Sequence, residues 1–410
     1  MMKKIMYWFF AVGVGLTLLT SCGPSEENVF GDVDDSQTTP QYIIDYNKAF
    51  ELHNYRDYPN AVYAYEQALK AIDALKPEKK NTDTVKDVYK KSVMGAALCY
   101  GNLNNIDSAK KYFTQYQTMW PNELDGYLKF GGILERNNLP EEAYAQYKKA
   151  MDLDPTNATA EFALAKIYKD DKKFDQAITF FEAGLKKQPN FQDGNGWFML
   201  GDTYREKGDY VNQVKAYERM VQLRSDDWQA YYYLAQAYRV IGEKTGSDNK
   251  DWRKLRIEYY TKSVDNYKKG LSLKADSDGL MRGIAGSYQN LAEMFKGKKE
   301  FNQYYQESVK YLIIFTQNKP NDYFGFALLA EAYSKLGNAK DALENAQISV
   351  KINSDSTSNA MGYSVLGDVY FSQGAWPAAR NAYLNIVNNP SYVYVRSRIE
   401  ICEARIRGEY

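Results

Sequence analysis

The sequence predicts an all-α fold built from repeated pairs of antiparallel helices. Three prolines, Pro121, Pro155 and Pro189, are spaced 34 residues apart, and a matching position recurs at Ser225 after two extra residues. Small and aromatic residues recur between them with the same spacing. A fixed period of this length is typical of arrays in which each unit packs only against its neighbours. With 44% apolar side chains in 410 residues, the chain has enough apolar surface for a continuous core.

The first 21 residues have the layout of a secretory signal peptide. Lys3 and Lys4 precede an apolar stretch from Ile5 to Leu19. The next residues, Thr20-Ser21-Cys22, complete a segment that resembles the lipobox of bacterial lipoproteins. This resemblance implies that residues 1–21 are removed and that Cys22 is acylated, which would anchor the chain to a membrane. An uncleaved anchor is the alternative, but the apolar stretch is short of the ~20 residues that a bilayer needs.

Residues 22–41 are expected to form a flexible acidic tether. They contain few apolar side chains and no basic residue, so they lack the means to build a core. Ser25-Glu26-Glu27 resembles the short acidic export signal of surface lipoproteins in the Bacteroidota. The alternative is that acidic residues simply populate a linker.

Residues 42–390 carry the helical repeat. In each unit, small residues stand where two helices approach closely, aromatic residues fill the gaps, and a proline often follows the second helix. This pattern resembles the tetratricopeptide repeat. The resemblance implies a right-handed superhelical α-solenoid of about nine helix pairs. The residues expected to pack the helices together include Gly131, Ala165, Trp197, Leu200, Gly201, Tyr204, Ala235, Tyr238, Ala330 and Gly367.

Two units are longer than the rest, with extra residues near 243–254 and 296–300. Such insertions lengthen helices or form loops, sometimes on the binding face, although simple loop growth is favoured here. Residues 391–410 are expected to form a capping helix. Its charged residues alternate with Val395, Ile399, Cys402 and Ile406, which gives it the polar outer face that a terminal helix needs.

The sequence predicts no catalytic, metal or cofactor site. His53 is the only histidine, and no other His or Cys is near it in sequence to complete a zinc site. Glycine-rich phosphate loops and a nucleophile elbow are absent from the sequence. Cys99 and Cys402 are expected to be buried apolar side chains rather than disulfide partners, because they lie near opposite ends of the array.

Charge argues against a nucleic-acid partner. Removing residues 1–21 takes away Lys3 and Lys4 and leaves 50 basic and 52 acidic residues, a net charge of −2. Nucleic-acid binding requires a surplus of cations to neutralise phosphates.

The expected site is the concave groove that the family resemblance implies. Mapped onto the central units, the groove positions are Phe162, Lys166 and Lys169, then Phe198, Asp202 and Arg205, then Tyr232, Gln236 and Arg239. Aromatic rings interleaved with Arg and acidic residues are typical of protein–protein contacts. The alternatives are that some rings pack against a neighbouring helix, or that they stack on sugars. Further along, the equivalent positions hold Arg282, Gln289, Phe324, Glu331, Asp368 and Phe371.

Together these features predict a non-catalytic scaffold, lipid-anchored in the bacterial cell envelope at the outer membrane, that binds an envelope protein in its groove. Similar lipoproteins serve outer-membrane assembly, secretion or gliding, and cell-wall machinery. The alternative is a surface glycan-binding lipoprotein of a polysaccharide-utilisation system.

Overall fold

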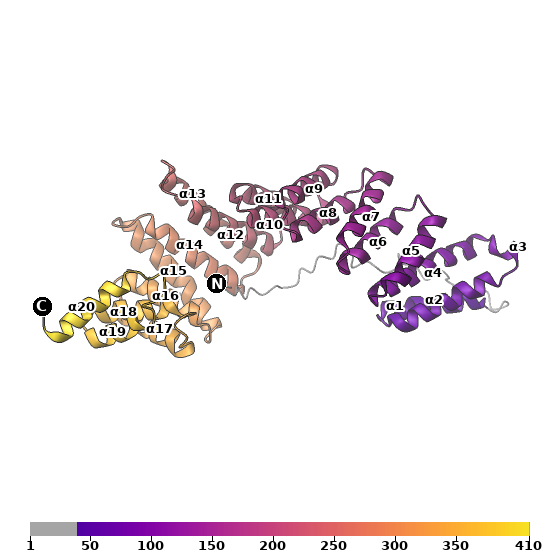
Figure 1. Cartoon of the computed structure of the whole chain (residues 1–410). Coiled ribbons are helices and arrows are strands. Elements are labelled where there is room, and N and C mark those ends of the chain that lie inside the picture. The colour runs from indigo at the N-terminus through magenta and orange to yellow at the C-terminus, as the bar shows by residue number, and fades with distance from the viewer. Residues whose placement is uncertain (1–38, 410) are drawn as a thin grey trace. The chain divides into compact units, whose positions relative to one another are not determined.

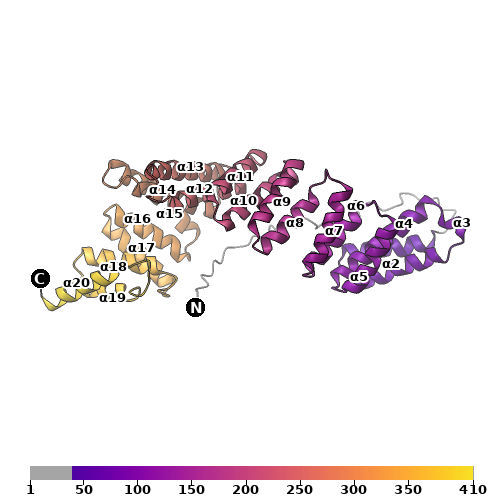
Figure 2. The same ribbon diagram turned by 45° about the horizontal axis from the view of Figure 1, so that its top comes forward.

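The computed structural model describes residues 39–409, which are folded into helices and connecting turns without a strand. The predicted signal peptide, Cys22 and nearly all of the predicted tether lie outside the described residues. The chain divides into two compact units, Met1–Gln192 and Asp193–Tyr410. The same helix-pair arrangement builds each unit (Figures 1 and 2).

The described part of unit 1 consists of four helix pairs and one short additional helix, α3 (Pro77–Lys80). The pairs are α1 (Gln41–Asn54) with α2 (Tyr58–Asp73), α4 (Asp83–Asn102) with α5 (Ile106–Met119), α6 (Leu124–Arg136) with α7 (Pro140–Leu153), and α8 (Thr159–Asp170) with α9 (Phe174–Lys187).

The described part of unit 2 consists of five helix pairs and a final helix, α20 (Val395–Arg407). The pairs are α10 (Asn195–Lys207) with α11 (Tyr210–Leu223), α12 (Trp228–Lys244) with α13 (Trp252–Leu273), α14 (Asp278–Glu293) with α15 (Lys299–Asn318), α16 (Tyr323–Lys335) with α17 (Ala339–Ile352), and α18 (Ala360–Ser372) with α19 (Trp376–Leu384).

The predicted fold class is confirmed, because each helix other than the short α3 packs against the next long helix along the chain within a unit. Successive first helices also contact one another: α4 with α6 and α6 with α8 in unit 1, and α12 with α14, α14 with α16 and α16 with α18 in unit 2. Comparable contacts between successive second helices do not occur in the described residues. The first helices therefore form the more closely spaced row in each unit, and we call the surface of this row the inner face.

Tyrosine rings packed on glycines hold the helix pairs together. The ring of Tyr147 in α7 lies on Gly131 in α6, so closely that a Cβ on Gly131 would be 2.7 Å from a ring carbon. Gly201 with Tyr217 and Gly367 with Tyr383 repeat this contact at the same spacing of 16 residues. The rings of Tyr147 and Tyr383 are almost fully buried. The small residue is thus required where two helices approach most closely, and this use accounts for part of the chain's 37 tyrosines.

Left-handed residues and prolines set the turns. Within most pairs the turn contains one residue with positive φ, for example Asn104, Asn138 or Gly208, which reverses the chain direction. Between pairs, α5, α7 and α9 each end two residues before Pro121, Pro155 and Pro189 respectively, as proline cannot continue a helix.

The two extra residues before Ser225 fall in the connection between α9 and α10. A short 3₁₀ turn, Phe191–Gly194, occupies this connection, and Gln192, Asp193 and Gly194 have φ values of 44°, 51° and 89°. The division between the two units lies in the same turn. The break in sequence period therefore coincides with a run of left-handed backbone.

The longer units extend their helices. α13 contains 22 residues and α15 contains 20, compared with 14 for each of α5, α7, α9, α11 and α17. Of the residues near 243–254, those from 245 to 251 form the loop between α12 and α13, and the others lie at the ends of these two helices. Of the residues near 296–300, the first three precede α15 and the last two begin it.

The C-terminal helix α20 packs against α19 through Val395, Ile399 and Cys402, all of which are buried. Ile406, which the sequence pattern assigned to the same apolar stripe, is 48% exposed. Ile406 is therefore not part of the buried stripe; it lies one residue before α20 ends at Arg407.

Two glycines on α14 test the ring-on-glycine contact. A Cβ on Gly283 would lie 2.5 Å from the ring of Tyr267, whereas a Cβ on Gly286 would meet nothing within 4 Å. We expect Gly283→Ala to destabilise the protein by about 1–3 kcal/mol. Gly286→Ala is the matched control, and its better helix propensity should stabilise by about 0.5–1 kcal/mol. Thermal unfolding followed by circular dichroism measures both, and equal shifts in the midpoint would contradict the packing argument.

Candidate functional site

Aromatic rings form a continuous row on the inner face of unit 2. The ring of Phe198 in α10 is 4.9 Å from that of Tyr233 in α12, and Tyr233 is 5.7 Å from Tyr232. Tyr232 in turn lies 5.8 Å from Tyr267 of α13. Phe198, Tyr232 and Tyr233 are half-buried, so each ring packs within the unit and also presents an edge or face to solvent.

Arginines stand among these rings. Arg282 of α14 lies 5.9 Å from the ring of Phe324 and 5.8 Å from that of Phe315, and its nearest anion, Asp322, is 4.0 Å away. Arg239 of α12 pairs with Glu243. Burial alone would lower the pKa of Arg239, but the nearby Tyr267 and Glu243 outweigh it and the pKa is raised. Arg239 therefore stays charged at the edge of the aromatic row.

Asp202, Arg205 and Gln236 complete the predicted positions in unit 2. Arg205 donates its Nε–H to Asp202 at 2.9 Å, so these two charges largely neutralise each other on α10. Gln236 of α12 is half-buried beside Tyr232. The structure thus brings five of the six predicted residues of unit 2 to partly exposed positions, and Arg205 to a more exposed one, with 51% of its side chain accessible.

Carboxylates replace the arginines further along the inner face. Tyr305 donates its hydroxyl to Glu293 of α14 at 2.7 Å, and Tyr383 and Tyr394 donate to Asp368 of α18 at 2.6 and 3.0 Å. Glu331 of α16 has no hydrogen bond or ion pair with another described residue. Its pKa is raised, mainly because burial disfavours the charge; Glu293 and Asp368 add to this effect, and Lys335 opposes it.

In unit 1, the structure places two of the three predicted groove residues at partly exposed positions. Lys166 of α8 forms an ion pair with Glu135 of α6, which also accepts a 3.0 Å hydrogen bond from the hydroxyl of Tyr147. Lys169 is half-buried on the same helix.

The prediction that Phe162 lines an open groove is wrong. Its ring is fully buried, stacked on Phe191 at 3.8 Å between centroids and tilted against Phe181 at 5.9 Å. Phe191 comes from the connection that contains the two extra residues, and it covers the position that would otherwise be open. Phe162 is therefore a core residue.

The residues predicted to pack the helices together lie where close contact is needed. All are buried except Trp197, which is half-buried: Gly131, Ala165, Leu200, Gly201, Tyr204, Ala235, Tyr238, Ala330 and Gly367.

Sequence reasoning missed one polar cluster in unit 1. The sulfur of Cys99 lies 3.4 Å from Nδ1 of His53, and the hydroxyl of Tyr65 lies 3.5 Å from the same nitrogen. Burial raises the pKa of Cys99 to about 12, so it is a thiol at neutral pH rather than a nucleophilic thiolate. Because His53 and Cys99 are 46 residues apart, no local motif could have revealed the pair.

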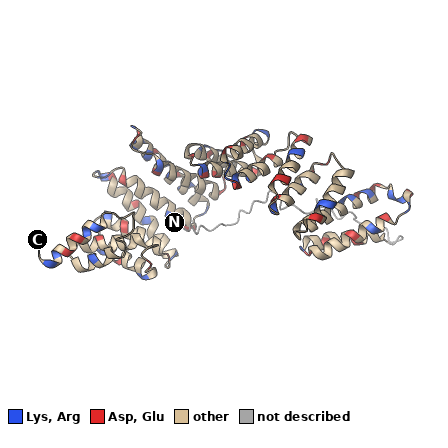
Figure 3. Ribbon diagram, in the orientation of Figure 1, with Lys and Arg blue, Asp and Glu red and all other residues tan. Residues whose placement is uncertain are grey.

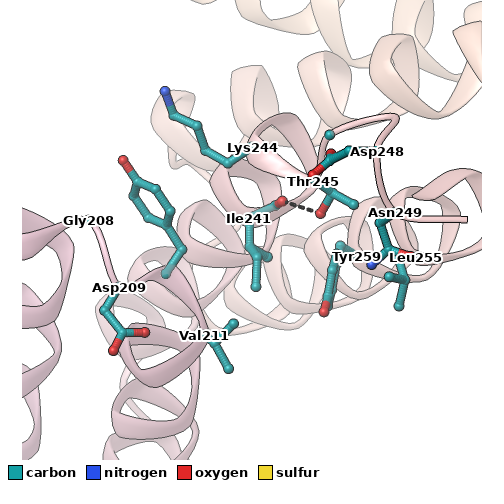
Figure 4. A pocket seen from close by; sticks show the side chains of 12 residues that line it. Gly208, Asp209, Val211, Ile241, Lys244, Thr245, Asp248, Asn249, Leu255 and Tyr259 are labelled. Atoms are coloured by element: carbon teal, nitrogen blue, oxygen red, sulfur yellow. Dashed lines mark hydrogen bonds between the residues drawn. The ribbon is translucent and has the colours of Figure 1, made fainter. Parts of the chain in front are cut away.

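The insertion in unit 2 borders a surface recess of about 470 Å³. Figure 4 shows Val211 of α11, Ile241 of α12 and Tyr259 of α13 around it, with the hydroxyl of Thr245 bonded to the carbonyl of Ile241 at 2.7 Å. Its lining mixes these side chains with Asp209, Lys244 and Asp248. The extra residues therefore shape the surface at the end of α12.

No group of three His, Cys, Asp or Glu residues within residues 39–409 is placed to hold a metal ion. None of the helices in that range combines the length and the apolar character that a membrane span requires. Basic and acidic residues are interspersed along the described helices (Figure 3).

Sequence profiles of the tetratricopeptide repeat match residues 92–123, 134–195, 195–227 and 328–392. The chain therefore contains tetratricopeptide repeats in both units. Proteins built from these repeats act as protein-interaction scaffolds and are typically non-catalytic.

Individual relatives match parts of the chain. Superkiller protein 3 of Schizosaccharomyces pombe is 27% identical over 127 residues, 31% of this chain and 8% of that protein. Tetratricopeptide repeat-containing protein trd-1 of Caenorhabditis elegans is 27% identical over 205 residues, 49% of this chain and 25% of that protein. The chain thus spans a quarter or less of these relatives. The solved C-terminal part of a TPR repeat-containing protein from Cytophaga hutchinsonii is 18% identical, with a TM-score of 0.45, covering 65% of this chain and 94% of that one.

The reassignment of Phe162 can be tested against Phe324, which is 38% exposed on the inner face of unit 2. We expect Phe162→Ala to destabilise the protein by about 3–5 kcal/mol, because it empties a closely packed site. Phe324→Ala should cost less than about 1 kcal/mol, since most surface changes are small. Thermal unfolding measures the loss of stability in each variant. A loss at Phe162 as small as that at Phe324 would contradict the assignment of Phe162 to the core.

Proposed function

We propose that this chain is a non-catalytic protein-binding scaffold that is lipid-anchored in a bacterial cell envelope and holds an envelope protein on its inner face. The observation that carries the proposal is the row of half-buried rings on α10 and α12, with Arg239 and Arg282 beside it. Tyrosine and arginine are enriched at interface hot spots because they combine large contact area with directed polar groups.

The anchor rests on the residues around Cys22, which resemble a lipobox behind a signal peptide. Acyl chains on that cysteine would hold the protein at the membrane, since two or more chains bind far more firmly than one. Outer-membrane assembly, secretion or gliding, and cell-wall machinery are the systems in which such an anchored scaffold would act. The inner face would then bind an envelope protein that belongs to one of these systems.

The partner site is tested by replacing Phe198, Arg205, Tyr232 and Arg239 together with alanine. We expect at least a tenfold loss of partner recovered by in-cell crosslinking, pull-down from solubilised membranes and mass spectrometry, with the helical circular-dichroism signal retained. The matched control replaces Lys215, Arg219 and Lys269, which are exposed on the second helices α11 and α13. Equal recovery with both variants would place the binding site elsewhere, and binding only to immobilised polysaccharide would favour the glycan-binding alternative.

The anchor is tested by Cys22→Ser. We expect this variant to lose incorporation of an alkyne-labelled fatty acid and to leave the membrane fraction. The Cys402→Ser variant is the control, because this cysteine is buried in unit 2 and should not affect labelling. Persistent labelling of the Cys22→Ser protein would refute the lipoprotein assignment.

A further inference from the structure

Glu331 differs from the acidic residues at two equivalent positions on the inner face of unit 2, each of which has a partner in the chain. In two other pairs, an acidic residue follows the glycine on which a tyrosine ring lies: Asp202 after Gly201, and Asp368 after Gly367. The tyrosine of the same pair lies 15 residues further on, and in the second case its hydroxyl, that of Tyr383, donates to Asp368 at 2.6 Å. In that pair the ring anchors the helices while its hydroxyl satisfies the carboxylate, whereas Asp202 is paired with Arg205.

In the pair α16 and α17, the carboxylate is present but the hydroxyl donor is not. Ala330 precedes Glu331, and Ala346 occupies the position, 15 residues after Glu331, that holds tyrosine in the other two pairs. Both alanines are fully buried in one cluster, so the two helices pack closely without a ring. Glu331 therefore lies on the inner face without the tyrosine hydroxyl that Asp368 accepts in the next pair.

The surroundings of Glu331 are acidic and aromatic. Glu293 of α14 and Asp368 of α18 lie on the helices that flank α16, and both already accept tyrosine hydroxyls. Tyr392 and Tyr394, just before α20, stand beside this group, with 6.5 Å between their ring centroids. Lys335, one turn further along α16, is 3.8 Å from Glu293 rather than paired with Glu331.

A half-buried carboxylate without a hydrogen bond or ion pair is unfavourable, because burial removes part of its water and Lys335 compensates only at a distance. Proteins pair such charges, so the missing cation is expected to come from outside the chain. A side-chain cation suits the site, because tyrosine faces attract Lys and Arg. A metal ion does not, since no group of three ligating residues in the described chain is placed to hold one.

We propose that Glu331 receives a lysine or arginine side chain of the partner, with Tyr392 and Tyr394 beside it. This inference rests on the proposed function, since it assigns the chemistry of the segment bound on the inner face. The partner segment would place its basic residue at α16 and apolar or aromatic residues along the row that includes Tyr232 and Tyr233.

The test uses a phage-displayed library of random dodecapeptides, selected on the purified full-length chain. The selected peptides should share a Lys or Arg at one position. By fluorescence anisotropy, Glu331→Gln should weaken their binding at least tenfold, and so should replacing the shared basic residue with glutamate. Glu344→Gln is the matched control, because Glu344 is exposed on the second helix of the same pair, and its binding should stay within twofold.

Stability separates a binding role from a structural one. Glu331→Gln removes an unpaired, partly buried charge, so its thermal midpoint should equal or exceed that of the unchanged protein. The double variant Ala330→Gly with Ala346→Tyr restores the arrangement of Gly367 and Tyr383. Its new hydroxyl should occupy Glu331 and weaken binding of the basic peptides at least tenfold, although the carboxylate is still present.

Selected peptides without a shared basic residue, or unchanged affinity in Glu331→Gln, would overturn this inference, as would a failure to select any peptide. If peptides unaffected by Glu331→Gln still lose affinity when Tyr232 and Arg239 are replaced, only the role of Glu331 is refuted and the proposed binding on the inner face stands. Peptides whose affinity is unchanged by either set of substitutions would overturn both the proposed inner-face binding and the role of Glu331.

Discussion

The packing of a tyrosine ring on a glycine of the facing helix is the contact on which the rest of the structure depends. Gly131, Gly201 and Gly367 leave room for the rings of Tyr147, Tyr217 and Tyr383, and each pair has the same separation along the chain. Because protein interiors are close-packed, the ring and the small residue must vary together. Ala165 and Phe181 have the same separation along the chain, and Ala330 and Ala346 form a third combination. The helix spacing, and hence the inner face, follows from these pairs.

The same tyrosines link the core to the surface. A buried hydroxyl needs a hydrogen-bond partner, and on the inner face that partner is a carboxylate such as Glu135, Glu293 or Asp368. The acidic residues of this face are therefore partly structural, held by the rings that pack the helices. Glu331 differs because its pair is closed by two alanines. The residues that pack the core of a helix pair thus decide whether the carboxylate on its inner face is bonded to a tyrosine hydroxyl or is free to bind a partner.

Much of the fold was predictable from the sequence, and the exceptions have physical causes. The proline spacing and the recurring small residues predict the helix pairs, since both depend on local geometry. Phe162 was misplaced because Phe191, which covers it, lies in the lengthened connection between α9 and α10, whose path the repeat pattern does not encode. The His53 and Cys99 contact joins residues far apart in the chain, which only the packing of α1 against α4 brings together. The sequence placed Glu331 at a groove position. That it lacks a hydroxyl donor becomes clear only when the hydrogen bonds of the different helix pairs are compared.

Hydroxyl-bound carboxylates also constrain how such an array can evolve new partners. Changing Asp368 would leave Tyr383 with an unsatisfied hydroxyl inside the pair, so a gain in recognition there carries a loss in folding. Positions on the inner face with no such bond, such as Gly286 with open space around it, can change identity without disturbing the helix beneath. Substitutions that change binding specificity should therefore accumulate at inner-face positions without such a hydrogen bond, while the acidic residues bonded to tyrosine should change more slowly.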